Sequence, residues 1–474
     1  MKIKHIIIIA VVILVTNLAT YIGVTSMEET RVIHYGQNRD EAEASQEPVA
    51  VEELALIREI LTILEMSHLE EVDRKELMEG AYRGILEELG DPEAGYLDPE
   101  EYANLLVQTE GTYGGIGIEV FYDDGYVTVI TPIAGTPGEE AGLSSGDRII
   151  TVDGIDLVGE GLNKAVNLMR GEPGTAVTIE VDRPAVDEIL EFEIIRAEVE
   201  LESVESKMLD DVTGYIKLTS FTETSSRDFS EALQKLEEEG MEKLVLDLRD
   251  NPGGLLTAAI EIADMLIPEG PITHVTDGRE RVETYSSDTE GLGIPMVAIV
   301  NESSVSAAEV LAGALQDSGT ATLVGKQTFG KASVQNINEL SDGSALRHTV
   351  ATYETPDGRT IHEEGLAPDL EVDPPELVKI ASEPISIELA QGDDGEGVET
   401  LQRLLKELGF YDHDITGFFD ERTTRALESF QGERGIEVTG EMSALVLRQF
   451  QEAIEDFRKN VDPKLDAALE ELNR

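Results

Sequence analysis

The stretch LVLDLRDNPGGLLTAA, residues 244–259, decides the fold of the largest part of the chain. Its apolar first half is typical of a buried strand, and the Asn-Pro-Gly-Gly turn at 251–254 separates it from a segment typical of a helix. Two glycines after a strand also let backbone N–H groups face a substrate carbonyl, as an oxyanion hole requires. An ordinary strand-to-helix turn has the same appearance, so this stretch alone leaves both interpretations open.

The same alternation of strand and helix continues on both sides of this turn. Strand-like segments lie at 243–249, 295–300 and 320–325, and helix-like segments lie at 229–240, 257–267 and 307–319. This order predicts an α/β core with a largely parallel sheet over residues 212–360.

The stretch NESSVSAAEVLAGAL, residues 301–315, places a serine at the start of a predicted helix. Ser306 and Glu309 have the spacing of a capping box, so Ser306 can be a purely structural N-cap. A serine in that place also lies beside unpaired amides and the positive end of the helix dipole, which can stabilise an oxyanion. The pattern therefore permits a cap, a nucleophile or both.

A lysine takes the place where a histidine base would be expected. The nearest histidines in sequence are His274 and His348, but VGKQTFGKASVQ at 324–335 contains Lys331. If this segment is extended, Lys331 and Gln335 point to the same face, although a solvated strand face with one lysine fits equally well.

Composition excludes several classes of function. The 474 residues are enough for about three domains, and the net charge of −61 argues against nucleic acid or anionic lipid as partners. Because there is no cysteine, disulfides and thiol catalysis are excluded. The seven histidines lack paired spacing, so we expect no metal and no cofactor.

The N-terminal segment predicts export. Lys2 and Lys4 precede a mostly apolar stretch at 6–24, which is near the length of a membrane-spanning helix. No clear Ala-x-Ala cleavage site follows, which favours a signal anchor over a signal peptide. Either interpretation predicts that the remainder is extracytoplasmic, anchored to the membrane or secreted to the cell envelope.

The segment at 112–157 resembles a PDZ domain. GGIGI at 114–118 and GTPGEEAGLSSGDRIITVDG at 135–154 carry the resemblance. It implies a site for the C-terminal carboxylate of a peptide, with the backbone amides of Ile116, Gly117 and Ile118 converging on the anion. Arg170 lies at the end of the predicted helix of this segment. It either adds a positive charge near the carboxylate site or is a solvated surface residue.

The three catalytic segments, in this order, resemble the carboxyl-terminal processing (tail-specific) protease family, which uses a Ser/Lys dyad. The resemblance covers about residues 48–375 and implies a crotonase-like ββα core with an inserted PDZ domain. It assigns Ser306 as the nucleophile and Lys331 as the base, since Lys331 and not Lys326 has the Gly-Lys-x-x-x-Gln pattern. Gln335 would orient the lysine.

The same resemblance implies an oxyanion hole. The amide of Ala307 would be one donor, and Gly253 or Gly254 would supply the other, with Gly253 preferred. The reaction would be acyl transfer, in which a neutral lysine takes the serine proton. Because the −61 charge favours a protonated lysine, we expect a rate that rises with pH and shifts to lower pH as salt increases.

The C-terminal part resembles a peptidoglycan-binding domain of three short helices. Its pattern is Gly-Asp-x-Gly-x-x-Val-x-x-Leu-Gln from Gly392, then Thr-Gly-x-Phe-Asp, Ala-x-x-x-Phe-Gln and Val-Thr-Gly. The expected organisation is a multidomain α/β chain: signal anchor or signal peptide 1–26, linker 27–47, N-terminal helical segment 48–110, PDZ domain 111–196, serine protease core 197–375, linker 376–386, small all-α domain 387–452 and helical tail 453–474.

We therefore expect an extracytoplasmic serine endopeptidase that binds the free C-termini of protein or peptide substrates, with peptidoglycan and the membrane as further partners. One alternative is a non-catalytic peptide- and wall-binding scaffold with the same fold. Another is acyl-CoA chemistry, since crotonase-type folds place similar double-glycine loops after strands. The substrate, the activation mechanism and self-association stay open.

Overall fold

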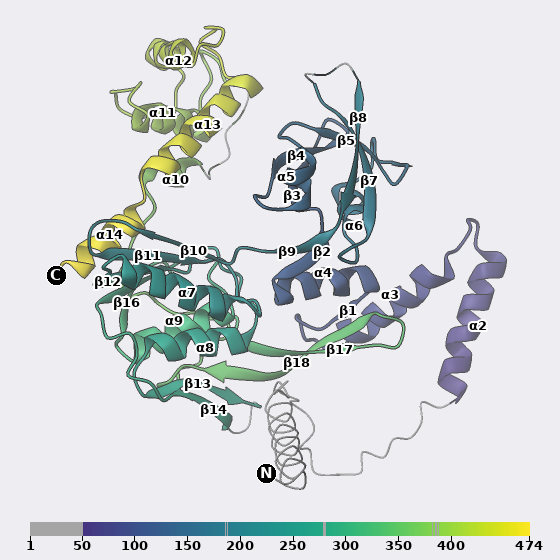
Figure 1. The fold of residues 1–474 in the computed structure, drawn as a ribbon. Helices are drawn as coiled ribbons and strands as arrows, with labels where there is room; N and C mark the ends of the chain where they lie inside the picture. Colours follow the sequence, from purple (N-terminus) through teal and green to yellow (C-terminus); the bar gives the residue numbers. More distant parts are fainter. Residues whose placement is uncertain are drawn as a thin grey trace, which may run out of the picture. The chain divides into compact units, whose positions relative to one another are not determined.

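The computed structural model of the chain describes residues 51–184, 186, 188–277, 281–381, 383, 386 and 388–474 (Figure 1). The apolar stretch at 6–24, for which we expect a signal anchor or signal peptide, and the linker at 27–47 lie outside the described residues. Within the described ranges, no helix is both long and apolar enough to span a bilayer.

The core sheet contains both of the strands that lead into the candidate catalytic loops. Its strand order is β10, β11, β12, β15, β16, β19, and every neighbouring pair except β10–β11 is parallel. The bounds are β10 (Val204–Met208), β11 (Thr213–Leu218), β12 (Lys243–Asp247), β15 (Met296–Val300), β16 (Ala321–Gly325) and β19 (Leu370–Glu371). The predicted α/β core with a largely parallel sheet is confirmed.

Both faces of this sheet are covered. One face packs on helices α7 (Ser225–Glu238), α8 (Leu256–Leu266) and α9 (Ala307–Asp317). The other face packs on the C-terminal helix α14 (Pro463–Leu472), which Figure 1 shows beside β12 and β16. Successive residues of a strand point to opposite faces, so burial on both sides explains why the strands are continuous apolar runs.

A second set of strands is interspersed in sequence with the strands of the core sheet. Strand β13 (Gly270–Thr276) pairs antiparallel with β14 (Arg281–Ser287) and with the end of β18 (Ala345–Glu354). Strand β17 (Ser333–Glu339), which follows Lys331, also pairs with β18.

Residues 51–99 and 335–350 form a compact unit of their own. It contains α2 (Val51–Ser67), α3 (Arg74–Glu87) and β1 (Gly95–Leu97), which pairs with the first residues of β18. The helical pattern is interrupted before α3, where the Asp73 carboxylate accepts the amide of Lys75 at 2.7 Å and begins a new helix.

The PDZ-like segment is a twisted antiparallel sheet in the order β3, β4, β5, β7, β8, with β6 paired to β5 and a separate β2–β9 pair. The bounds are β2 (Thr112–Gly115), β3 (Ile118–Asp123), β4 (Tyr126–Pro132), β5 (Arg148–Val152), β6 (Ile155–Asp156), β7 (Ala176–Asp182), β8 (Ile189–Ile195) and β9 (Ala197–Glu200), with α4 (Pro99–Glu110) before the segment and α5 (Pro137–Ala141) and α6 (Leu162–Met169) within it. Because β3 is an edge strand, its outer side is open to an added strand.

The C-terminal part is helical, as expected. Its helices are α10 (Glu376–Ala381), α11 (Glu396–Glu407), α12 (Glu421–Glu433) and α13 (Ala444–Asn460). They share an apolar core that includes Val398, Leu401, Phe430 and Phe450. Helix α13 runs past residue 452, where we placed a boundary, and leads into α14.

Candidate active site

Ser306 lies between strand β15 and helix α9, and it is the residue that precedes the first residue of that helix. The predicted capping box with Glu309 is formed. The two neighbouring serines have other surroundings: Ser304 is fully buried and its hydroxyl donates to the Leu248 carbonyl at 2.8 Å, whereas Ser303 is exposed. Ser306 alone combines a helix-start position with contact to the double-glycine turn.

The backbone of Ser306 has an unusual conformation. Its φ is 56° and its ψ is −115°, a region that L-residues adopt only when the surrounding structure holds them there, at a cost of about 1–3 kcal/mol. Two contacts hold it: the Ser306 N–H donates to Glu309 Oε2 at 2.9 Å, and the Tyr353 hydroxyl donates to the Ser306 carbonyl at 2.8 Å. Such conformations cluster at sites of chemistry.

Gly253 lies directly against the serine. A Cβ atom at this position would be 2.9 Å from Ser306 Cβ and 3.0 Å from the Ala307 nitrogen, and the φ of Gly253 is 95°. Only glycine combines this φ with so close an approach. The double-glycine turn predicted from the sequence and the start of helix α9 therefore form one site.

The amides at this site differ in their partners. The Gly253 N–H donates to Asn251 Oδ1 at 2.8 Å. Within the described part of the chain, the N–H groups of Gly254 and Ala307 form no hydrogen bond outside regular helix and strand pairing. A substrate oxyanion at Gly253 would compete with Asn251, so the choice between Gly253 and Gly254 as donor stays open.

Glu309 connects the serine segment to the lysine segment. Its carboxylate accepts the Ser306 and Lys331 amides through Oε2, the latter at 2.8 Å, and it accepts the Gly330 amide through Oε1 at 2.7 Å. The Thr328 hydroxyl also donates to Oε1. Burial raises the pKa of the Glu309 carboxyl, while these four donors lower it. A buried carboxylate with four donors holds both segments in one geometry.

Tyr353 makes a second connection between the same two residues. Its hydroxyl contacts the carbonyl oxygen of Ser306 and that of Lys331. Burial raises the pKa of Tyr353 well above its usual value, and Glu309 raises it further, so the hydroxyl stays protonated. Glu309 and Tyr353 thus bind the N–H and C=O groups of both Ser306 and Lys331.

Sequence reasoning missed the role of Tyr353. It occupies an alternating position in β18, where an aromatic residue is usual in any strand, so nothing in the sequence marks it. Glu309 was visible as the last residue of the capping box, but its contacts to Gly330 and Lys331 depend on the tertiary fold.

Lys331 and Gln335 lie on the segment that leads into and begins β17. Lys331 lies two residues before Ser333, the first residue of the strand. The orientation of Lys331 by Gln335 stays a prediction. The Gln335 side-chain amide donates to Glu93 Oε2 at 2.8 Å.

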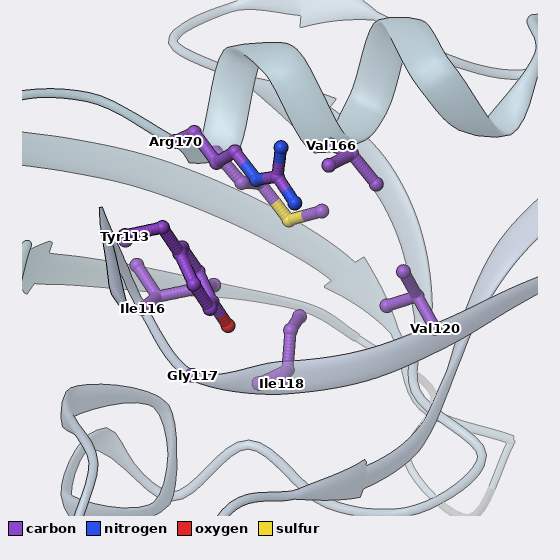
Figure 2. A pocket seen from close by; sticks show the side chains of 9 residues that line it. Tyr113, Ile116, Gly117, Ile118, Val120, Val166 and Arg170 are labelled. Atoms are coloured by element: carbon purple, nitrogen blue, oxygen red, sulfur yellow. The ribbon is translucent and has the colours of Figure 1, made fainter. Parts of the chain in front are cut away.

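A second candidate site is the groove between β3 and α6 of the PDZ-like segment. Figure 2 shows Ile118 and Val120 along the strand and Val166 and Arg170 on the helical side. The amides of Ile116 and Gly117 lie between β2 and β3 and make no backbone hydrogen bond to another described residue. Gly117 has a φ of 70°, and a Cβ there would be 2.3 Å from the Thr136 side chain.

Arg170 directly follows α6 and lines this groove. Its guanidinium lies over the Tyr113 ring, 5.1 Å from the centroid, and Nη1 donates to Asn104 Oδ1 at 2.7 Å. Its Nε is buried and has no partner among the described residues. An unsatisfied buried donor beside unused amides is suited to an anion.

Comparisons with known proteins agree with this architecture. Four family models match: peptidase family S41 at 212–372, the PDZ domain at 128–183, the peptidoglycan binding domain at 394–453 and the activating protease CtpB N-terminal domain at 13–101.

Full-length relatives are similar over most of the chain. Carboxy-terminal processing protease CtpA of Bacillus subtilis is 33% identical over 418 residues, which are 87% of this chain and 88% of the relative. The carboxyl-terminal-processing protease of Synechocystis is 38% identical and covers 62% of this chain and 71% of its own length. A solved photosystem II D1 C-terminal processing protease is 33% identical, covers 68% of this chain and 87% of its own, and has a TM-score of 0.41. The chain therefore belongs to the carboxy-terminal processing serine proteases of peptidase family S41.

Proposed function

We propose that this protease cleaves peptide bonds with Ser306 as nucleophile and Lys331 as general base. The observation that carries the proposal is the shared bracing of the two residues, because Glu309 accepts the N–H of both and Tyr353 contacts the C=O of both. A nucleophile and its base must keep a fixed separation, and such bracing supplies it.

The proposed reaction has two acyl-transfer steps. Neutral Lys331 takes the hydroxyl proton of Ser306 while Oγ attacks the substrate carbonyl carbon, and the carbonyl oxygen becomes an oxyanion. The resulting ammonium then donates its proton to the leaving amine as the C–N bond breaks, which leaves an acyl ester on Ser306. Water, deprotonated by Lys331, hydrolyses that ester and restores the free serine.

The oxyanion would accept the Ala307 amide and an amide of the double-glycine turn. The close approach of Gly253 to Ala307 N supports this, because two donors must converge on one oxygen. The positive end of helix α9 adds to the same stabilisation.

Substrate binding is proposed to begin at the PDZ groove. A substrate C-terminus would add as a strand to the edge of β3, with its carboxylate at the amides of Ile116, Gly117 and Ile118 and near Arg170. The side chains of Val120, Val166 and Met169 also line the groove, which favours an apolar C-terminal residue.

We further propose that the enzyme works outside the cytoplasm and binds peptidoglycan through residues 387–452. The match of 394–453 to a peptidoglycan binding family supports the second statement. The apolar N-terminal stretch at 6–24 supports the first.

The test compares the wild type with Ser306→Ala and Lys331→Ala on a set of peptides that differ at the C-terminus. Both variants should lose cleavage almost completely. Exposed Ser303→Ala is the matched serine control, and Lys326→Ala, whose amine pairs with Glu371 and Asp373, is the matched lysine control. Both controls should cleave normally.

Retained cleavage in Ser306→Ala or Lys331→Ala would overturn the dyad. If the wild type binds peptides without cleaving them, the non-catalytic scaffold is favoured. If it binds an acyl-CoA, acyl-CoA chemistry is favoured.

A further inference from the structure

The second face of the core sheet is covered by the last helix of the chain. Tyr215, Val245, Val297, Ile299 and Val324 point to this face and are buried. Helix α14 covers them with apolar side chains, and its Ala468 is fully buried. Residues 463–472, which the sequence suggested to be part of a helical tail, therefore belong to the packing of the protease core.

Polar contacts hold α14 at both ends. At its start, the Asp462 carboxylate accepts Arg249 Nη1 at 2.8 Å and Nη2 at 2.7 Å. At its end, Lys243 Nζ donates to the Leu472 carbonyl at 3.0 Å and to Asn473 Oδ1 at 2.8 Å. A negative charge at the start of a helix and a positive charge at its end both interact favourably with the helix dipole and stabilise the helix.

Arg249 is held on its other side by Asp247, an almost fully buried carboxylate at the end of β12. Asp247 also accepts the Tyr215 hydroxyl at 2.7 Å. Burial raises the pKa of Asp462, but its bonds to Arg249 outweigh this and hold the pKa below the usual value. The Arg249–Asp462 pair is bidentate and half-buried, which makes it stronger than an exposed ion pair.

Arg249 lies at the beginning of the loop that ends in Gly253. The next residue, Asp250, has a φ of 59° and accepts Asn301 Nδ2 at 2.9 Å. The Asn251 carbonyl accepts the Val305 amide at 2.9 Å. The loop before Gly253 and the loop before Ser306 are therefore one bonded assembly, and α14 contacts it through Arg249.

Lys464 adds a positive charge on α14 near these loops. It is partly buried and lies near Glu302 and Asp250, one on each loop, as well as near Asp462 and Arg249. Burial lowers the pKa of Lys464, whereas the nearby carboxylates raise it.

We infer that α14 positions the oxyanion loops of the protease, with Asp462 acting through Arg249 as a positioning residue for Gly253 and Ser306. The inference rests on the proposed function, because it concerns the same Ser306 site. It also means that the helical domain at 387–452 is joined at both ends to the protease core, through β19 and through α14. Asp462, which follows that helical domain in sequence, thus supports the oxyanion loops through Arg249.

The test uses the full chain with Asp462→Asn, which keeps the side-chain shape and weakens the bond to Arg249. The matched control is Asp466→Asn, which removes the same charge from an exposed position of α14. Active sites are counted by fluorophosphonate labelling of Ser306, and kcat and KM for a peptide are expressed per labelled site. We expect kcat to fall about tenfold in Asp462→Asn, with KM within about twofold, since the loss falls on transition-state stabilisation. Asp462→Glu should recover most of the rate, and Asp466→Asn should match the wild type.

The outcomes separate the two proposals. If the wild type cleaves but Ser306 takes no label, the proposed dyad fails. If Ser306 is labelled and kcat per labelled site is the same in Asp462→Asn as in the wild type, only the positioning role fails. A variant that loses labelled sites while each remaining site works normally would show a stabilising role alone and would overturn the inference.

Discussion

The proposed dyad site and the groove of the PDZ-like segment are built in opposite ways. At the dyad site, four donors occupy the buried Glu309 carboxylate and the Tyr353 hydroxyl contacts two carbonyls. In the groove, Arg170 Nε is buried and has no hydrogen-bond partner in the described part of the chain. The backbone amides of Ile116 and Gly117 likewise donate no backbone hydrogen bond to a described residue.

This difference fits the proposed division of the protein into a site of chemistry and a site of recognition. A site that makes and breaks bonds needs its polar groups fixed before the substrate arrives, because reorganisation during the reaction raises the barrier. A site that recognises a carboxylate needs donors that the ligand itself will satisfy. Changes at the first site should therefore alter kcat, and changes at the second should alter KM.

The largest effect is expected from Gly253→Ala. Its Cβ would lie 2.7 Å from the Val305 carbonyl and 2.9 Å from Ser306 Cβ, so the turn must move and the oxyanion donors separate. We expect kcat to fall at least about 100-fold, which is the size of losing one oxyanion donor. The control is Gly293→Ala, whose φ of 68° is also positive but whose Cβ meets nothing within 4 Å. The Gly293→Ala variant should keep its activity. An equal loss of kcat in both variants would contradict the importance of the close approach between Gly253 and Ser306.

The next effect is expected from Glu309→Gln. A glutamine amide cannot accept all four hydrogen bonds, and its NH₂ group would face other donors. We expect kcat to fall about 30-fold because the Ser306 and Lys331 segments lose their common anchor, with little change in KM. Glu261→Gln changes an exposed glutamate of α8 and should have no effect. A normal kcat in Glu309→Gln would contradict the role of Glu309 in holding the Ser306 and Lys331 segments together.

A smaller effect is expected from Arg170→Ala in the groove. It should raise KM about tenfold for peptides with a free C-terminus, since one charge-assisted hydrogen bond is lost, and leave kcat near normal. Peptides with an amidated C-terminus should be cleaved equally by variant and wild type. Arg148→Ala, which removes an arginine stacked on Tyr126, is the control. An equal rise in KM for amidated peptides would mean that Arg170 does not recognise the carboxylate.

The smallest effect concerns the pH dependence of stability. Because the pKa of Glu309 is raised above 4.5 in the folded protein, its contribution to stability is fully present below that pH and is lost as the pH rises through the raised value. Denaturant unfolding should therefore show the wild type losing stability relative to Glu309→Gln as the pH rises above about 4.5. A difference independent of pH would contradict the raised pKa.

The sequence was sufficient for the parts of the fold that depend on local patterns. The strand, turn and helix at 244–259 predicted the α/β core, and the glycine of the turn at 253 does lie against Ser306. These features could be predicted because a double glycine and a capping box each fix backbone geometry over a few residues.

Features that join distant segments could not be predicted. Tyr353 and Glu309 meet Lys331 only in the folded chain, and the sequence gives no hint that Asp462 contacts Arg249. The amphipathic pattern of 463–472 is typical of any surface helix, and only the buried second face of the sheet explains its place in the core.

The most direct test of the account is the rate at which a fluorophosphonate labels Ser306, followed by mass spectrometry of the labelled peptide. The account predicts that the wild type carries the label on Ser306 and that Lys331→Ala is labelled at least about 100 times more slowly, because the serine has lost its base. A label on another residue, or an unchanged rate in Lys331→Ala, would contradict the Ser306–Lys331 dyad.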